Sequence, residues 1–293
     1  RFGSPKLLAP FAGATMLAAV IDTARRAGLD PVVVDAVPTD GADRWRPRQP
    51  EESDIAFLQY TSGSTAAPKG VIVDHGNLLA NELAIQAALQ TTESDVFVSW
   101  LPLFHDMGLV GGLFHPLYCG IPLVLVSPAY FLERPVRWLE LLSRHRGTIS
   151  GGPDFAYRLC LERITDAQLR SLDLSTWRIA FSGAEPVRHG TLHAFAQRFA
   201  SAGFKASAIY PCYGLAEATL LVTGVRAGGG MTARTYSSEH LANGRAETCE
   251  VGTTLVACGT TQPSHRLHIV DPSTGVEQIE GHIGEIWASG PSV

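Results

Sequence analysis

Basic residues are in short supply in this sequence, and their scarcity excludes one large class of partners. The 293 residues contain 23 lysines and arginines against 28 aspartates and glutamates, which gives a formal net charge of −5 at pH 7. Proteins that bind nucleic acid carry a surplus of positive charge on the binding surface. We therefore expect no nucleic-acid partner.

Cysteine pairs of the kind that hold zinc or build a disulfide framework are also missing. The five cysteines are an odd number, and no two of them are separated by two residues. This pattern is typical of free thiols in a reducing compartment, so we expect a cytoplasmic protein. No secretory signal is recognisable at the start, and the chain begins with Arg1 rather than methionine, so we expect a piece of a longer protein.

Charge is absent from residues 107–132, the one stretch that imitates a membrane span. Glycine and proline interrupt this stretch at Gly111, Gly112, Pro116, Gly120 and Pro122. A membrane-spanning helix needs about twenty consecutive apolar residues. We predict instead a buried helix of about ten residues followed by a buried strand, and no transmembrane segment.

The sequence has neither the Gly-x-Ser-x-Gly elbow of serine hydrolases nor a Walker A loop. Residues 57–70 do, however, join a short apolar run to hydroxyl residues and a lysine: Phe-Leu-Gln-Tyr-Thr-Ser-Gly-Ser-Thr-Ala-Ala-Pro-Lys-Gly. Hydroxyls and exposed backbone N–H groups suit an anion. We predict a phosphate loop built from Thr61, Ser62, Gly63, Ser64 and Thr65, with Lys69 as a mobile positive charge. A flexible Ser/Gly linker is the alternative.

Apolar residues alternate between strand-like and helical spacing along most of the chain. Strands are predicted at 31–35, 58–60, 71–73, 96–101, 122–126, 148–150, 177–182 and 266–271, and helices at 16–26, 77–89, 135–146, 155–163 and 188–200. Such alternation predicts an α/β fold with a mostly parallel sheet covered by helices on both faces. Ligands bind at the carboxyl ends of parallel strands, so the segments that follow these strands are the candidate site.

The segment after the strand near residue 210 holds Tyr213, Gly214 and Glu217, at what we predict to be a strand-to-helix turn. The tyrosine ring suits stacking on a flat base, and the carboxylate suits Mg²⁺, which prefers oxygen ligands. An ordinary buried tyrosine and a glutamate at a helix start are the alternative. The earlier segment after residue 101 holds His105, with Asp106 beside it as a candidate partner, although adjacent residues on a helix do not face each other.

The hydroxyl loop resembles that of the adenylate-forming superfamily, although Ala66 stands where most members have glycine. The sequences of four longer segments resemble those of fatty acyl-AMP ligases: residues 58–65, 99–109, 127–135 and 211–219. The resemblance implies the large N-terminal domain of that fold with a β-rich C-terminal part. It also implies ATP-dependent conversion of a fatty acid to acyl-adenylate and pyrophosphate, for transfer to an acyl carrier protein. An acyl-CoA synthetase and a non-catalytic acyl- or nucleotide-binding module are the alternatives.

The same resemblance assigns roles to individual residues. ATP and Mg²⁺ are the implied cofactors, with the hydroxyl loop and Lys69 on the phosphates and Glu217 on the metal. His105 lies near the acyl carboxylate, so His105, Glu217 and Lys69 are the catalytic candidates. The residues expected around the adenine are Gly183, Ala184, Glu185, Tyr213 and Gly214.

The resemblance also divides the chain. Residues 1–231 form the α/β part of the large domain, which we expect to be incomplete at its N-terminus. Residues 232–259 correspond to a family-type insertion, with an ordinary surface loop as the alternative, and residues 260–293 begin the β-rich subdomain. The C-terminal lid domain with its lysine is not encoded, so we expect the isolated chain to be nearly inactive.

Overall fold

The computed structural model describes residues 10–11, 14–15, 50–61 and 69–293. The chain divides into two units, residues 1–50 and 51–293. In the first unit, β1 (Pro10–Phe11) pairs antiparallel with β2 (Ala14–Thr15). The helix expected over 16–26 and the strand expected over 31–35 lie outside the described residues.

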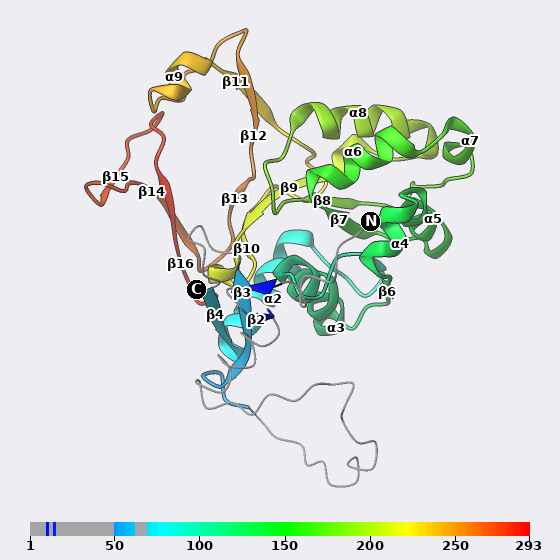
Figure 1. Ribbon diagram of the computed structural model, residues 1–293, viewed down its shortest axis with the longest axis horizontal. Helices are drawn as coiled ribbons and strands as arrows, with labels where there is room; N and C mark the ends of the chain where they lie inside the picture. The colour runs from blue at the N-terminus through cyan, green and yellow to red at the C-terminus, as the bar shows by residue number, and fades with distance from the viewer. Residues whose placement is uncertain (1–9, 12–13, 16–49, 62–68) are drawn as a thin grey trace. The chain divides into compact units, whose positions relative to one another are not determined.

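A seven-stranded sheet forms the centre of the second unit (Figure 1). Five of its strands are parallel, in the order β9 (Ile209–Gly214), β8 (Ile179–Ser182), β7 (Ile149–Gly152), β5 (Phe97–Ser99) and β6 (Leu123–Leu125). Two antiparallel strands, β10 (Leu221–Gly224) and β13 (Thr260–Thr261), extend the sheet beyond β9. The prediction of an α/β fold with a mostly parallel sheet is confirmed.

Helices connect the parallel strands and cover both faces of the sheet. In chain order they include α2 (His75–Leu89), η4 (Met107–Phe114), α3 (His115–Cys119), α4 (Pro128–Glu133), α5 (Val136–His145), α6 (Asp154–Arg163), α7 (Asp166–Leu169) and α8 (His189–Phe199). The Phe97 ring of β5 contacts His115 of α3. Trp100, three residues later and therefore on the opposite face, contacts Trp138 of α5. The four helices predicted within the described residues are confirmed, whereas the short α4 and α7 were not predicted.

The apolar stretch 107–132 contains a helix followed by strand β6, as predicted, but the first part of that helix is a π-helix. In η4 the His115 N–H binds the Val110 carbonyl, five residues back. Two glycines bring this helix close to the sheet: a Cβ on Gly108 would collide with the Pro102 carbonyl, and one on Gly112 would lie 2.7 Å from the Ser99 hydroxyl. Within the described ranges, no helix is long and apolar enough to cross a membrane.

Strands β3 (Ile55–Thr61) and β4 (Lys69–Asp74) form an antiparallel pair of their own. The expectation that the hydroxyl loop follows a strand of the parallel sheet is wrong, because β3 pairs with β4 and with no other described strand. Alternation of apolar residues identifies a strand but not its partner. Residues 62–68 of the loop itself lie outside the described residues.

The C-terminal part of the unit is built from small antiparallel sheets. β11 (Ala233–Tyr236) pairs with β12 (Thr253–Val256), and α9 (Ser238–Ala242) lies between them in sequence. β14 (Arg266–Asp271) pairs with β15 (Val276–Glu277) and β16 (Glu285–Ser289), which confirms the strand predicted at 266–271. The proposed insertion over 232–259 therefore contains paired strands, and its boundaries stay a prediction.

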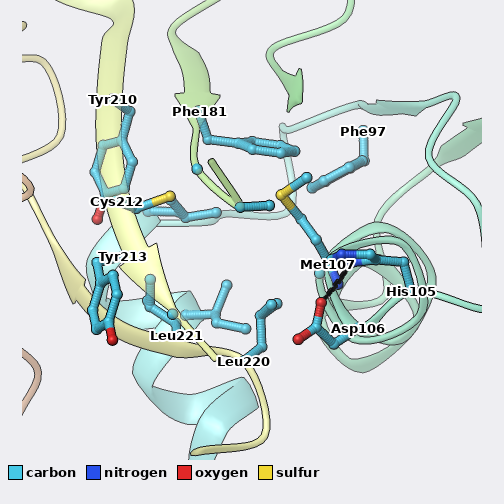
Figure 2. Close-up of a pocket in the computed structure, with 16 residues that line it drawn as sticks. Phe97, His105, Asp106, Met107, Phe181, Tyr210, Cys212, Tyr213, Leu220 and Leu221 are labelled. Atoms are coloured by element: carbon cyan, nitrogen blue, oxygen red, sulfur yellow. Dashed lines mark hydrogen bonds and ion pairs between the residues drawn. The ribbon is translucent and has the colours of Figure 1, made fainter. Parts of the chain in front are cut away.

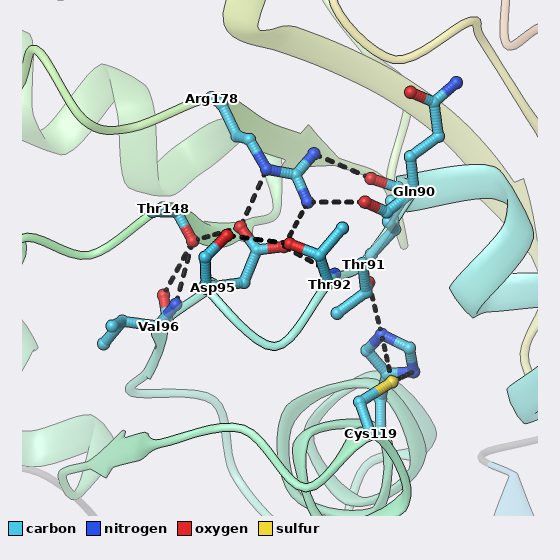
Figure 3. A network of polar contacts seen from close by, with 11 residues as sticks. Gln90, Thr91, Thr92, Asp95, Val96, Cys119, Thr148 and Arg178 are labelled. Atoms are coloured by element: carbon cyan, nitrogen blue, oxygen red, sulfur yellow. Dashed lines mark hydrogen bonds and ion pairs between the residues drawn. The ribbon is translucent and has the colours of Figure 1, made fainter.

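Arg178 and Asp95 join the amino-terminal edge of the sheet to the end of helix α2 (Figure 3). The guanidinium donates to both Asp95 carboxylate oxygens, at 2.8 and 2.6 Å, and to the Leu89 carbonyl at 2.8 Å. The Thr148 hydroxyl donates to the same carboxylate at 2.7 Å. Burial raises the pKa of Asp95, but hydrogen bonds from Arg178, Thr148 and the Thr92 N–H outweigh it and leave the pKa below its ordinary value of 3.8.

We expect Arg178→Lys to lower the free energy of unfolding by about 1–3 kcal/mol, because an ammonium group cannot form the paired hydrogen bonds to a buried carboxylate.

Since the folded-state pKa of Asp95 is lowered, its contribution to stability is complete above the unfolded pKa and is lost as the pH falls through the folded pKa. Melting temperatures measured between about pH 5 and pH 2 should therefore fall less steeply in Asp95→Asn than in the wild type.

Arg158→Lys is the matched control, because Arg158 pairs with Glu162 at 4.0 Å on an exposed helix face. It should change neither the stability nor its pH dependence. Identical pH profiles for Asp95→Asn and the wild type would contradict this account of the Asp95 carboxylate.

Candidate active site

A cavity of about 230 Å³ opens where the carboxyl ends of the sheet meet α2 and η4 (Figure 2). Its walls are mainly apolar and include Phe97, Met107, Phe181, Leu220 and Leu221. Five of the residues predicted from the sequence also line it: His105, Gly183, Ala184, Tyr213 and Gly214. The structure thus brings together residues that follow β5 and β8 with residues at the end of β9, as the carboxyl-edge argument required.

Tyr213 lies near the end of β9 with its ring at the edge of the cavity (Figure 2). Partial burial, and then the negative charge of Glu217, raise the pKa of the Tyr213 phenol. The phenol therefore stays neutral at pH 7. An aromatic face beside a neutral hydroxyl, close to a carboxylate, is suited to a flat ligand that carries a cation or a metal-bound phosphate.

The loop after β8 approaches the backbone of β9 closely. A Cβ on Gly183 would lie 3.1 Å from the Cys212 sulfur and 3.2 Å from the Cys212 carbonyl oxygen, so any larger residue would press on the backbone of β9. The next residue, Ala184, has a φ of +66°, which is unfavourable for a side chain with a Cβ. Burial raises the pKa of the Cys212 thiol to about 12, so this cavity cysteine is not a nucleophile at pH 7.

Glu185 is not among the residues that line the cavity, and its side chain contacts the start of α6. Its carboxylate accepts a 2.6 Å hydrogen bond from the Phe155 N–H. In the reverse direction, the Asp154 carboxylate of α6 accepts from the Arg188 N–H at 2.9 Å, just before α8. These two hydrogen bonds hold the loop between β8 and α8 against the start of α6. The predicted contact of Glu185 with an adenine stays a prediction.

Glu217 lies on the short 3₁₀ turn η7 (Ala216–Ala218), exposed between two buried alanines. We predicted a strand-to-helix turn here, and this is wrong: the chain reverses after η7 into β10, which pairs antiparallel with β9. A tight hairpin with one helical turn carries the same residue types at the same spacing as a helix start. Glu217 nevertheless lies close to Tyr213.

The surroundings of Glu217 fit a magnesium ion only together with a phosphate ligand. No described residue forms a hydrogen bond or an ion pair with its carboxylate. Across the described ranges, no group of three His, Cys, Asp or Glu side chains is placed to hold a metal. Mg²⁺ commonly takes one or two carboxylates and completes its shell with phosphate oxygens and water, so a single free carboxylate suffices.

His105 and Asp106 face each other, so Asp106 is confirmed as the partner of His105 although the two residues are adjacent. The distance from His105 Nδ1 to Asp106 Oδ1 is 2.6 Å, and the same carboxylate oxygen accepts from the Met107 N–H at 2.6 Å. The divergence of neighbouring side chains applies inside a helix, whereas His105 precedes η4 and Asp106 caps it. The pair lies in the cavity lining, with His105 about half exposed and Asp106 largely buried.

Thr61 and Lys69 are directly opposite each other in the β3–β4 pair, so the two ends of the hydroxyl loop meet. Neither residue is among those that line the cavity. Ser62, Gly63, Ser64 and Thr65 lie outside the described residues, and their role stays a prediction. Sequence reasoning missed the cavity walls Phe97, Met107 and Phe181, because apolar wall residues have the same signature as core residues.

Comparison with known families decides what this site belongs to. A model of the family described as AMP-binding enzyme matches residues 11–293. The chain belongs to the AMP-binding enzyme family.

Two curated members of the family illustrate its relatives. A medium-chain-fatty-acid–acyl-carrier-protein ligase of Teredinibacter turnerae is 47% identical over 243 residues, covering 82% of this chain and 38% of the relative. A second ligase with the same description, from Moorena producens, is 43% identical over 268 residues, covering 89% of this chain and 45% of the relative. The chain thus spans less than half the length of these relatives.

Solved structures confirm the adenylate-forming fold of this family member. A fatty acyl-adenylate ligase from L. pneumophila, crystallised with acyl adenylate and pyrophosphate, superimposes with a TM-score of 0.84 at 41% identity. The alignment covers 90% of this chain and 47% of that structure. The resemblance to fatty acyl-AMP ligases that the sequence motifs indicated is therefore confirmed.

A substitution at Gly111 tests whether the cavity binds an apolar ligand. A Cβ at this position would lie 3.0 Å from the flexible Leu220 Cδ2, and both Gly111 and Leu220 line the cavity, so a longer side chain here would take up cavity space. We expect Gly111→Leu to weaken binding of dodecanoic acid at least about tenfold. Displacement of a fluorescent fatty acid measures this affinity.

Gly190→Ala, on the exposed side of α8 with open space around it, is the matched control and should bind as the wild type does. Unchanged affinity in Gly111→Leu would show that the acid does not enter this cavity.

Proposed function

We propose that the full-length protein carrying this chain activates a fatty acid with ATP and passes the acyl group to an acyl carrier protein. The observation that carries the proposal is an apolar cavity with a polar rim. Apolar walls suit an acyl chain, whereas Tyr213 and the Gly183–Ala184 loop in the lining suit a nucleotide. Glu217 is not part of the lining, but its exposed carboxylate lies close enough to Tyr213 to raise the pKa of the phenol. The two relatives, both medium-chain-fatty-acid–acyl-carrier-protein ligases, support the same reaction.

In the proposed reaction the acid enters with its chain in the cavity and its carboxylate near His105. The carboxylate is already ionised at pH 7, so no protein base is needed. Its oxygen forms a bond to the α-phosphorus of ATP, and the bond from that phosphorus to pyrophosphate breaks. The products are acyl-adenylate and pyrophosphate. His105, held by Asp106, places a polar group beside the reacting carboxylate.

The nucleotide is proposed to lie along the rim. Tyr213 stacks on the adenine, and the backbone of Gly183 and Ala184 lies against its edge. Glu217 holds magnesium, which when bound neutralises charge on the phosphates. Lys69 and the hydroxyl loop add positive charge and hydrogen-bond donors there. Because both ATP and carrier proteins occur in the cytoplasm, we propose that compartment for the reaction.

The acceptor separates this proposal from an acyl-CoA synthetase. We expect the full-length protein, given ATP, Mg²⁺ and a medium- or long-chain acid, to accumulate acyl-adenylate and to release it to a phosphopantetheinylated carrier protein. Mass spectrometry of the products identifies each species. Formation of acyl-CoA from added coenzyme A would contradict the proposed acceptor, and absence of acyl-adenylate would favour a binding module.

Replacement of Glu217 tests the metal site. Glu217→Gln keeps the shape of the side chain but removes the charge that faces the metal. We expect acyl-adenylate formation to fall at least about tenfold, which corresponds to about 1.4 kcal/mol of transition-state stabilisation. The loss should be partly recovered at high Mg²⁺ concentration. Steady-state pyrophosphate release measures both effects.

Glu280→Gln provides a control of equal charge change, because Glu280 is exposed on the turn between β15 and β16. It should leave the rate unchanged. Full activity of Glu217→Gln at limiting Mg²⁺ would remove Glu217 from the metal site.

A further inference from the structure

Thr219 follows the turn that carries Glu217 and has an unusual backbone conformation. Its φ is 67° and its ψ is −58°, and the Leu220 N–H binds the Ala218 carbonyl at 2.8 Å across it. This is the strained form of the three-residue turn. A positive φ is especially unfavourable for a β-branched residue, so the surrounding structure must enforce it.

Asn81 of helix α2 supplies part of that enforcement from beneath the turn. Its side-chain amide is completely buried. The amide nitrogen donates to the Ala218 carbonyl at 3.2 Å and to the Leu221 carbonyl at 3.0 Å. The amide oxygen accepts from the Leu221 N–H at 3.0 Å. One side chain thus binds the backbone on both sides of Thr219.

The Thr219 hydroxyl provides a second attachment. It is buried and donates to the Ser292 carbonyl at 2.8 Å. Ser292 follows β16 and is itself anchored, because its hydroxyl lies 2.7 Å from His265 Nε2. The preceding carbonyl, of Pro291, accepts from the Asn77 amide of α2 at 3.0 Å. The hydroxyl therefore links the turn to a fixed segment of the C-terminal sheet.

These attachments determine where Glu217 points. Ala216 and Ala218 are turned into the protein, so Glu217 between them is turned out. The Leu215 N–H binds the Leu220 carbonyl at 3.0 Å and closes the loop at its base. Rotation of the backbone at Thr219 toward a relaxed negative φ would break this closure and redirect the carboxylate.

We propose that Thr219 is a positioning residue whose hydroxyl, bound to the Ser292 carbonyl, holds the strained turn so that Glu217 faces the nucleotide-bound magnesium. This inference rests on the proposed function, since it takes Glu217 as the metal carboxylate. Thr219 acts through the backbone and need not touch the nucleotide itself.

Thr219→Val and Thr219→Ser in the full-length protein separate the hydroxyl from the shape of the side chain. Valine keeps the branched shape and removes the hydroxyl, whereas serine keeps the hydroxyl. We expect the Mg²⁺ concentration for half-maximal acyl-adenylate formation to rise at least about fivefold in Thr219→Val, with the KM for the fatty acid unchanged. Thr219→Ser should stay within about twofold of the wild type.

Thr223→Val is the matched control. The Thr223 hydroxyl is also buried and also donates to a carbonyl, that of Cys258, at 2.8 Å, but it lies on β10 beyond the turn. Its loss should lower the melting temperature to a similar extent without changing the Mg²⁺ dependence. If Thr219→Val and Thr223→Val behave alike, Thr219 has a purely structural role and the inference is overturned.

MgATP affinity, measured by calorimetry, distinguishes failure of this inference from failure of the proposed reaction. A wild-type protein that makes no acyl-adenylate contradicts the reaction, yet the inference still requires Thr219→Val to bind MgATP more weakly than Thr219→Ser does. Equal affinities in the two variants, or a wild type that does not bind MgATP, would overturn the inference.

Discussion

Hydrogen bonds between helix α2 and distant backbone segments are the constraint on which the candidate site depends. Arg178 binds the carbonyl of Leu89 at the end of the helix, Asn81 binds the hairpin turn from its middle, and Asn77 binds the Pro291 carbonyl near its start. The same helix contributes Ile85 and Leu89 to the cavity wall. Because backbone groups buried without partners are unfavourable, these amides and this guanidinium fix the spacing between the apolar wall and the polar rim.

The arrangement separates two physical environments across a short distance. Apolar side chains on η4, β8 and β10 exclude water from the interior of the cavity. Transfer of an alkyl chain from water into this interior is therefore favourable. Polar groups stay nearer to solvent: the His105 imidazole in the lining is half exposed, and the Glu217 carboxylate on η7 is exposed. A molecule with one long apolar end and one polar end matches this division.

Local sequence patterns predicted the strands, the long helices and the residues after each strand, because period, glycine and hydroxyl content are local properties. Partners across the chain were not predictable in the same way. The sequence around Asn81 does not show that its amide binds the backbone of residues 218 and 221. Likewise, β3 has the sequence pattern of a central strand, although it pairs only with β4 among the described strands. Glu185 matched a family motif, yet its contact with the Phe155 N–H depends on how two helix starts meet.

The π-helical stretch of η4 also has a consequence for sequence variation within the family. Each π turn contains one residue more than an α turn. Removal of a single residue between Met107 and Phe114 would let the stretch continue as an ordinary α-helix into α3, while β5 and β6 keep their register. The same deletion within α5 would rotate its buried face away from the sheet. We therefore expect a change in length to be tolerated in the wall of the cavity, where it changes the shape of the cavity, and not in the helices that hold the sheet.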